Sequence, residues 1–128
     1  MKIEEVSALV VDDDSSMANL YSRILSRAGI KDIDVAGNEG DALKLMQENR
    51  YDFMMLDTED ITGDYGPRIL KKAREIGQNA FVVAVSGDPS NREKWEEIEH
   101  YTFYSKGDLK VSTLIDLVKK QFPRIDNI

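Results

Sequence analysis

Carboxylates follow two short apolar runs of the sequence. Asp12 and Asp13 come directly after residues 6–11 (VSALVV). Asp57 comes directly after residues 53–56 (FMML). If these runs are neighbouring strands, the three carboxylates converge and repel one another, so one is protonated or a cation lies between them. Oxygen ligands without histidine or cysteine favour a hard ion, and a few carboxylates with retained waters suit Mg²⁺.

An ion of that kind usually has a phosphate as a further ligand. Phosphoryl transfer needs charge neutralisation and an in-line nucleophile more than covalent chemistry from the protein. Asp57 is the candidate nucleophile, because carboxylates form acyl phosphates. Ser86 follows the apolar residues 80–85 (AFVVAV), and its hydroxyl can donate to a phosphoryl oxygen. Lys106 follows shortly after residues 101–104, and its ammonium can neutralise another oxygen.

Five strands and the helices between them must position these side chains. Apolar runs without helical spacing predict strands at residues 6–11, 53–56 and 80–85, and two shorter strands at residues 33–36 and 101–104. Strand and helix alternate five times with short connections, which predicts a parallel sheet with helices on both faces and right-handed crossovers. The expected fold class is therefore α/β, a doubly wound (βα)5 three-layer sandwich.

Helical spacing of apolar residues predicts the helices. One is expected through residues 17–28, capped by Asp14 or Ser15 and ended by Gly29. Asn38 is expected to cap a second helix, and Pro67 fits the first turn of a third that ends at Gly77. A short helix around residues 95–98 and a final helix through residues 111–122 complete the set, with polar loops at residues 58–65 and 86–91.

Length and composition restrict the function. The 128 residues predict a single domain spanning residues 1–128, with no output domain. The absence of cysteine excludes disulfides and thiolate catalysis, and one histidine, His100, argues against a histidine metal site or a Ser-His-Asp triad. The net charge of -7 argues against direct nucleic-acid binding. No apolar run is long enough for a membrane span and no leader is evident, so a cytoplasmic location is expected.

The set Asp12-Asp13, Asp57, Ser86 and Lys106, each just after its own strand, resembles the receiver domain of two-component response regulators. The resemblance covers essentially the whole chain, and the single-domain chemotaxis type is closest in size. It implies a flavodoxin-like sheet of order 2-1-3-4-5, in which sites form above the carboxyl ends of the strands. It further implies that Asp57 accepts a phosphoryl group from a histidine kinase or histidine phosphotransfer protein.

The same resemblance assigns roles to the other residues. Asp12, Asp13, Asp57 and the backbone carbonyl of Glu59 would hold Mg²⁺. Ser86 would turn onto the phosphoryl group and Lys106 would pair with it. Phe103, three residues before Lys106, matches the switch aromatic of the family.

Two further acids, Glu59 and Asp88, lie two residues after Asp57 and Ser86. In this family those positions border the path of the water that hydrolyses the acyl phosphate. Our hypothesis is that they set the lifetime of the phosphorylated state. The chain is then a phosphoacceptor signalling domain and not an enzyme, beyond self-phosphorylation from small donors and self-dephosphorylation. Its output would pass to an unknown downstream protein, from a monomer or a phosphorylation-dependent dimer.

The sequence also departs from the pattern of the family. Asp60 and Ile61 replace a common Met-Pro pair, and the following Asp-Gly appears as residues 64–66 (DYG), one residue longer. Gly107 follows Lys106 where a proline is common, and residues 86–106 are about two residues short. These departures favour an alternative, a receiver-like interaction domain that works without phosphorylation. A Mg²⁺-dependent phosphohydrolase with an aspartyl nucleophile is a third hypothesis, and it lacks an evident cap domain or substrate pocket.

Overall fold

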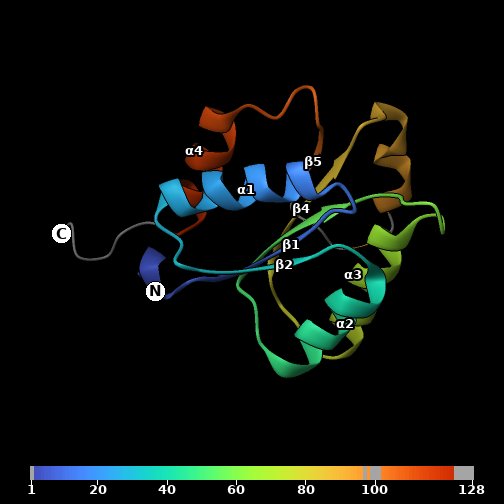
Figure 1. Cartoon of the computed structure of the whole chain (residues 1–128), viewed down its shortest axis with the longest axis horizontal. Helices are drawn as coiled ribbons and strands as arrows, with labels where there is room; N and C mark the ends of the chain where they lie inside the picture. The colour runs from blue at the N-terminus through green and yellow to red at the C-terminus, as the bar shows by residue number, and fades with distance from the viewer. Residues whose placement is uncertain (1, 97, 99–101, 123–128) are drawn as a thin grey trace.

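Five parallel strands form one sheet in the order β2-β1-β3-β4-β5 (Figure 1). In this computed structural model, which describes residues 2–96, 98 and 102–122, the predicted fold class and strand order are confirmed. The predictions for His100 and Tyr101 lie outside the described residues. The strands are β1 Ser7–Val11, β2 Asp32–Ala36, β3 Phe53–Asp57, β4 Phe81–Ser86 and β5 Thr102–Ser105.

Helices cover both faces of the sheet, as the alternation predicted (Figure 1). One face carries α1 (Ser15–Ala28) and α4 (Val111–Gln121). The other carries α2 (Glu39–Glu48), α3 (Tyr65–Glu75) and a 3-10 helix, η2 (Pro89–Trp95). A further short 3-10 helix, η1 (Ile3–Glu5), precedes β1. No helix within the described residues is long and apolar enough to cross a membrane.

The central strands are buried on both sides. All five residues of β3 are buried, and successive side chains enter opposite cores because the side-chain period of a strand is two. Met54 and Leu56 pack with α2, α3 and η2, whereas Phe53 and Met55 pack with α1 and α4. This double burial is why the run FMML has no polar alternation.

The caps at helix ends follow the sequence. The carboxylate of Asp14 accepts hydrogen bonds from the backbone N–H groups of Ser16 and Met17, and the side chain of Asn38 accepts one from Asp41. Gly29 ends α1 at φ 112°, a left-handed conformation that glycine adopts without the steric cost of a Cβ. The Asp14 cap makes α1 begin at Ser15, directly after the acids that follow β1.

Two element boundaries differ from the prediction. Tyr65, expected in a polar loop, is the first residue of α3 and is completely buried. The fourth crossover within the described residues contains the 3-10 helix η2, which begins at Pro89 inside the predicted loop and ends at Trp95. Asp88 caps this 3-10 helix by accepting a hydrogen bond from the backbone N–H of Ser90.

Candidate functional site

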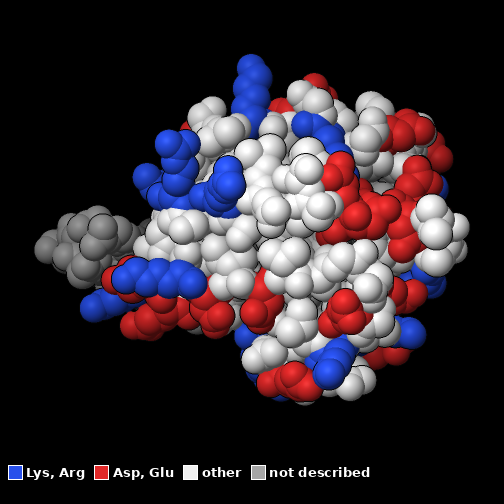
Figure 2. Space-filling view, in the orientation of Figure 1, with Lys and Arg blue, Asp and Glu red and all other residues white. Residues whose placement is uncertain are grey.

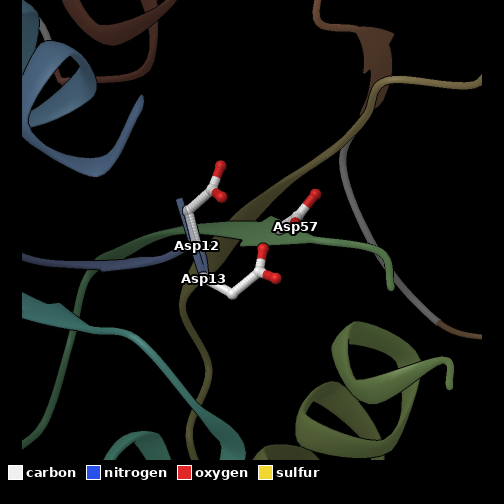
Figure 3. A group of neighbouring side chains, drawn as sticks. All are labelled: Asp12, Asp13 and Asp57. Carbon is white, nitrogen blue, oxygen red and sulfur yellow. The ribbon is translucent and has the colours of Figure 1, made fainter. Parts of the chain in front are cut away.

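The acids after β1 and β3 converge at the carboxyl ends of the strands. Val11 pairs with Leu56, so Asp12 and Asp57 are the next residues of two adjacent strands. One carboxylate oxygen from each of Asp12, Asp13 and Asp57 lies within 4.8 Å of the others, and the three side chains surround one space (Figure 3). Asp12 and Asp57 are buried, whereas Asp13 is exposed and opens the group to solvent.

Lys106 directly follows β5, the strand beyond β4, and its side chain reaches this cluster. Its Nζ lies 2.8 Å from Asp12 Oδ2 and 3.3 Å from Asp57 Oδ1. The backbone N–H of Lys106 donates to the carbonyl of Ser86 at 2.7 Å, which holds the start of the β5 exit loop against the end of β4. The structure therefore brings Lys106 to Asp12 and Asp57, and its pairing with a phosphoryl group stays a prediction.

Burial and charge shift the ionisation of the cluster. Burial, and next the charge of Asp12, raise the pKa of Asp57 to about 6, against opposing effects of Lys106 and of a hydrogen bond from Tyr65. Burial lowers the pKa of Lys106, but its hydrogen bond to Asp12 and the charge of Asp57 outweigh that effect and the pKa is raised. One ammonium against three carboxylates leaves excess negative charge.

This donor set fits a hard divalent cation. The three side chains offer only oxygen, and their oxygens are close enough together to share one ion. Acidic side chains also cover the neighbouring surface above the strand ends (Figure 2). The structure therefore agrees with the type of metal site that the sequence predicted, through Asp12, Asp13 and Asp57.

Tyr65 is a site residue that the sequence prediction missed. Its hydroxyl donates to Asp57 Oδ2 at 3.1 Å and accepts from the backbone N–H of Asp13 at 3.1 Å. The ring is completely buried although it stands in a run of polar residues. A large aromatic beside glycine and proline in an otherwise polar loop is the one signal that pointed to it.

The start of α3 is pressed against the end of β3. Gly66 donates its N–H to the carbonyl of Thr58 at 3.1 Å. A Cβ at Gly66 would lie 2.0 Å from the carbonyl oxygen of Asp57 and 2.9 Å from the ring of Trp95, so only glycine fits. Thr58 in turn donates to the carbonyl of Val85 at 2.8 Å and accepts from the indole N–H of Trp95 at 2.9 Å.

The loop after β3, which is one residue longer than is common in the family, contains a tight turn at residues 60–63. The backbone groups of Asp60 and Gly63 exchange two hydrogen bonds, at 3.0 and 3.1 Å. Ile61 at the tip of this turn is fully exposed. The turn returns the chain to the sheet at Tyr65, which places that side chain in the site.

Ser86 is the last residue of β4 and is buried. Its Oγ accepts hydrogen bonds from the N–H of Asp88 at 3.0 Å and from Asn91 Nδ2 at 2.8 Å. Both contacts use Oγ as an acceptor, so neither consumes the hydroxyl hydrogen. Asn91 Nδ2 also donates to Glu59 Oε1 at 3.1 Å, which makes Asn91 a second residue that the sequence prediction missed.

The two candidate tuning acids have different surroundings. Glu59 accepts from Asn91, and its other oxygen lies 3.5 Å from Lys94 Nζ. Asp88 caps η2 by accepting from the N–H of Ser90 at 2.9 Å, and these hydrogen bonds lower the pKa of its carboxyl. Both carboxylates lie at the edge of the site. Glu59 is hydrogen-bonded to Asn91, and Asp88 is hydrogen-bonded to Ser90.

Phe103, the candidate switch aromatic, points into the core under η2. It is buried in the same cluster as Trp95, and the guanidinium of Arg92 lies 5.0 Å from its ring centroid. The aromatic side chain thus packs against η2 from below while Arg92 covers it. A switching role stays a prediction.

Comparison with known proteins places this geometry in a family. The family model of the response regulator receiver domain matches residues 8–119. Two-component response regulator 24 of Arabidopsis thaliana is 28% identical over 118 residues, which cover 91% of this chain and 84% of that protein.

Solved structures of receiver domains are also similar. A Francisella response regulator receiver domain is 26% identical with a TM-score of 0.77, over 91% of this chain and 96% of that one. Response regulator protein TrrA from Thermotoga maritima, in complex with Mg²⁺-BeF, is 25% identical with a TM-score of 0.76, over 94% and 98% of the two chains. A CheY-like receiver domain protein from Methanospirillum hungatei, 18% identical with a TM-score of 0.79 over 91% and 93%, supports the fold alone.

Proposed function

The chain belongs to the family of response regulator receiver domains, and on that premise we propose that Asp57 accepts a phosphoryl group from a histidine kinase or a histidine phosphotransfer protein. One observation carries the proposal. Asp57 is a buried carboxylate at the end of a central strand, with Lys106 3.3 Å from one oxygen and two further acids beside it. Receiver domains are signalling domains, so the phosphorylated chain acts through a partner and not through turnover of a substrate.

The chemistry follows from the positions of the side chains. An oxygen of Asp57 attacks phosphorus, the bond from phosphorus to the donor breaks, and its electron pair leaves with the donor. Lys106 stands beside the attacking carboxylate and neutralises charge on the incoming phosphoryl oxygens. Mg²⁺, held by Asp12, Asp13, Asp57 and the backbone carbonyl of Glu59, would supply the remaining neutralisation when bound.

Ser86 would carry the signal away from Asp57. Its free hydroxyl hydrogen can be donated to a phosphoryl oxygen, and its Oγ is already bonded to Asn91 in η2. A movement of Ser86 toward the phosphoryl group therefore pulls on η2, which packs over Phe103. The readout is a change in the surface of η2 and β5, a shift between two packings of one fold.

Labelling tests this proposal directly. The protein is incubated with Mg²⁺ and a small acyl-phosphate donor and examined by intact mass, where one acid-stable, base-labile phosphoryl adduct is expected. Asp57→Asn should abolish the adduct. Asp52→Asn, which changes an acid just before the other end of the same strand, should keep it. A wild-type protein that takes no label under conditions that label an ordinary receiver domain contradicts the proposal.

The same measurement distinguishes the proposed function from the alternative, a receiver-like interaction domain that works without phosphorylation. The longer loop after β3 favours that alternative, because the Tyr65 hydroxyl already occupies Asp57 Oδ2. The intact acids, Ser86 and Lys106 favour phosphorylation. An unlabelled protein that still binds its partner would identify the interaction domain.

A further inference from the structure

Tyr65 contacts the acceptor carboxylate but belongs to none of the five positions that mark a receiver domain. Its hydroxyl bridges Asp57 Oδ2 and the backbone N–H of Asp13, at 3.1 Å each. We propose that Tyr65 is a positioning residue that shortens the lifetime of phosphorylated Asp57, by holding a hydrogen-bond donor on the carboxylate that must leave. The inference rests on the proposed phosphorylation of Asp57.

The backbone around Tyr65 is built to hold the hydroxyl in place. The N–H of Tyr65 donates to the carbonyl of Gly63 at 2.9 Å, and the next residue, Gly66, donates to the carbonyl of Thr58 at 3.1 Å. Gly66 also lies in close contact with the carbonyl oxygen of Asp57. The ring is wholly buried, and hydrogen-bonded backbone on both sides of Tyr65 positions its hydroxyl.

A donor at Asp57 Oδ2 favours the free carboxylate over the phosphorylated one. A carboxylate carries a full negative charge and accepts a strong, charge-assisted hydrogen bond. The carbonyl oxygen of an acyl phosphate carries less charge and accepts a weaker one. The hydroxyl of Tyr65 therefore stabilises the state that exists after hydrolysis more than the state before it.

The same difference acts during hydrolysis. Water attacks phosphorus, the bond between phosphorus and the Asp57 oxygen breaks, and the electron pair of that bond returns to the carboxylate. The water loses a proton to solvent, and inorganic phosphate leaves. Negative charge grows on Asp57 as the bond breaks, so a donor already in place lowers the barrier. Tyr65 remains a donor throughout, because a phenol keeps its proton at neutral pH.

Tyr65→Phe tests this role, and Tyr51→Phe is its matched control. Tyr51 is also buried and also donates to a carboxylate, Asp34 Oδ2 at 2.6 Å, but it lies at the opposite end of β3. Each protein is labelled with Mg²⁺ and a small acyl phosphate, freed of donor, and followed by intact mass. The adduct on Tyr65→Phe should decay several-fold to about tenfold more slowly than on wild type, since 1.4 kcal/mol corresponds to a factor of ten. Tyr51→Phe should decay at the wild-type rate.

A ring-fluorinated tyrosine at position 65 separates hydrogen bonding from packing. Fluorination makes the phenol a stronger hydrogen-bond donor, so the adduct should decay faster than on wild type. The decay rate should therefore increase from phenylalanine to tyrosine to fluorotyrosine at position 65. A general loosening of the site would not produce that order. The fluorinated protein also keeps the test decisive if Tyr65→Phe does not fold.

The outcomes are distinct. The role of Tyr65 is overturned if the adduct on Tyr65→Phe decays as fast as on wild type, or faster. It is also overturned if fluorotyrosine does not give the fastest decay. In each of these cases Asp57 remains the acceptor. A wild-type protein that takes no label contradicts the proposed function, and this inference with it.

Discussion

Gly66 lies against Asp57 so closely that a single methyl group on Gly66 would be 2.0 Å from the backbone carbonyl oxygen of Asp57. That oxygen belongs to the backbone and cannot move aside without displacing the end of β3. Gly66→Ala is therefore expected to lower the free energy of unfolding by more than about 3 kcal/mol, measured by urea denaturation.

Gly40→Ala is the control for that substitution. Gly40 lies in the first turn of α2, and the nearest atom a Cβ would meet is an oxygen of Asn38 at 3.5 Å, an ordinary contact. Alanine there should raise stability by about 0.5 to 1 kcal/mol through helix propensity. Equal effects of the two substitutions would mean that the close approach to Asp57 is absent in solution.

Asp57→Asn should stabilise the metal-free protein at neutral pH. The folded pKa of Asp57, about 6, lies above the unfolded value of 3.8, mainly because of burial. Between these values the folded state binds more protons than the unfolded state, so stability falls as pH rises from about 4 to about 6. Above pH 6 the full cost of ionising Asp57 is present, and its removal should raise the free energy of unfolding by about 3 kcal/mol.

The pH dependence makes this gain measurable. Urea unfolding in the presence of a chelator at pH 7.5 and pH 4 should show the gain at the higher pH and lose most of it at the lower. Asp116→Asn, which changes an exposed acid of α4, should show no such dependence. A gain of the same size at both pH values would contradict the raised pKa.

Lys106→Met should weaken both the fold and the labelling reaction. Lys106 Nζ is the partner of Asp12 at 2.8 Å and of Asp57 at 3.3 Å, and both carboxylates are buried. Loss of the ammonium should cost about 2 to 3 kcal/mol without metal and slow adduct formation about 100-fold. Unfolding and labelling of Lys119→Met, at an exposed position on α4, should match wild type. Labelling of Lys106→Met at the wild-type rate would remove Lys106 from the site.

The side-chain amide of Asn91 donates hydrogen bonds to both Ser86 and Glu59, and a carboxylate at position 91 should remove both of them. Asn91→Asp replaces a buried donor with an acceptor that faces Glu59 Oε1 and Ser86 Oγ. The change should lower the free energy of unfolding by about 2 kcal/mol. Glu59→Gln in the same protein should restore part of the loss, because the new amide can donate where the carboxylate repelled. A double-mutant cycle without coupling would show that Asn91 and Glu59 act independently.

Glu59→Ala and Asp88→Ala test whether the rim acids set the lifetime of the phosphorylated state. We expect each to change the decay of the adduct, followed by intact mass. Asp88→Ala should also lower the free energy of unfolding, because it removes the carboxylate that accepts from the N–H of Ser90. If the decay is unchanged in both variants, the rim acids do not tune hydrolysis.

The sequence predicted the sheet and the residues at its edge because both follow simple patterns. Fully buried strands read as unbroken apolar runs, and parallel strands bring the residues after them to one edge. Asp12, Asp13, Asp57 and Lys106 could therefore be grouped before any contact was known.

Tyr65 and Asn91 could not be found in that way. Both lie in polar segments without periodicity, and their burial depends on contacts from distant parts of the chain. Tyr65 is buried because Gly66 brings α3 onto the end of β3. Asn91 is buried because η2 folds back over Ser86 and Glu59. Such tertiary contacts leave no periodic pattern in the sequence.

The indole of Trp95 has a practical consequence for every experiment above. It is the only tryptophan of the chain, and its N–H donates to Thr58, the residue directly after the proposed acceptor Asp57. Its ring also contacts the backbone near Gly66. The tryptophan fluorescence of the unlabelled protein therefore originates at one point beside Asp57. We expect metal binding, phosphoryl arrival and phosphoryl loss each to change this emission, which would allow them to be followed in real time without a dye.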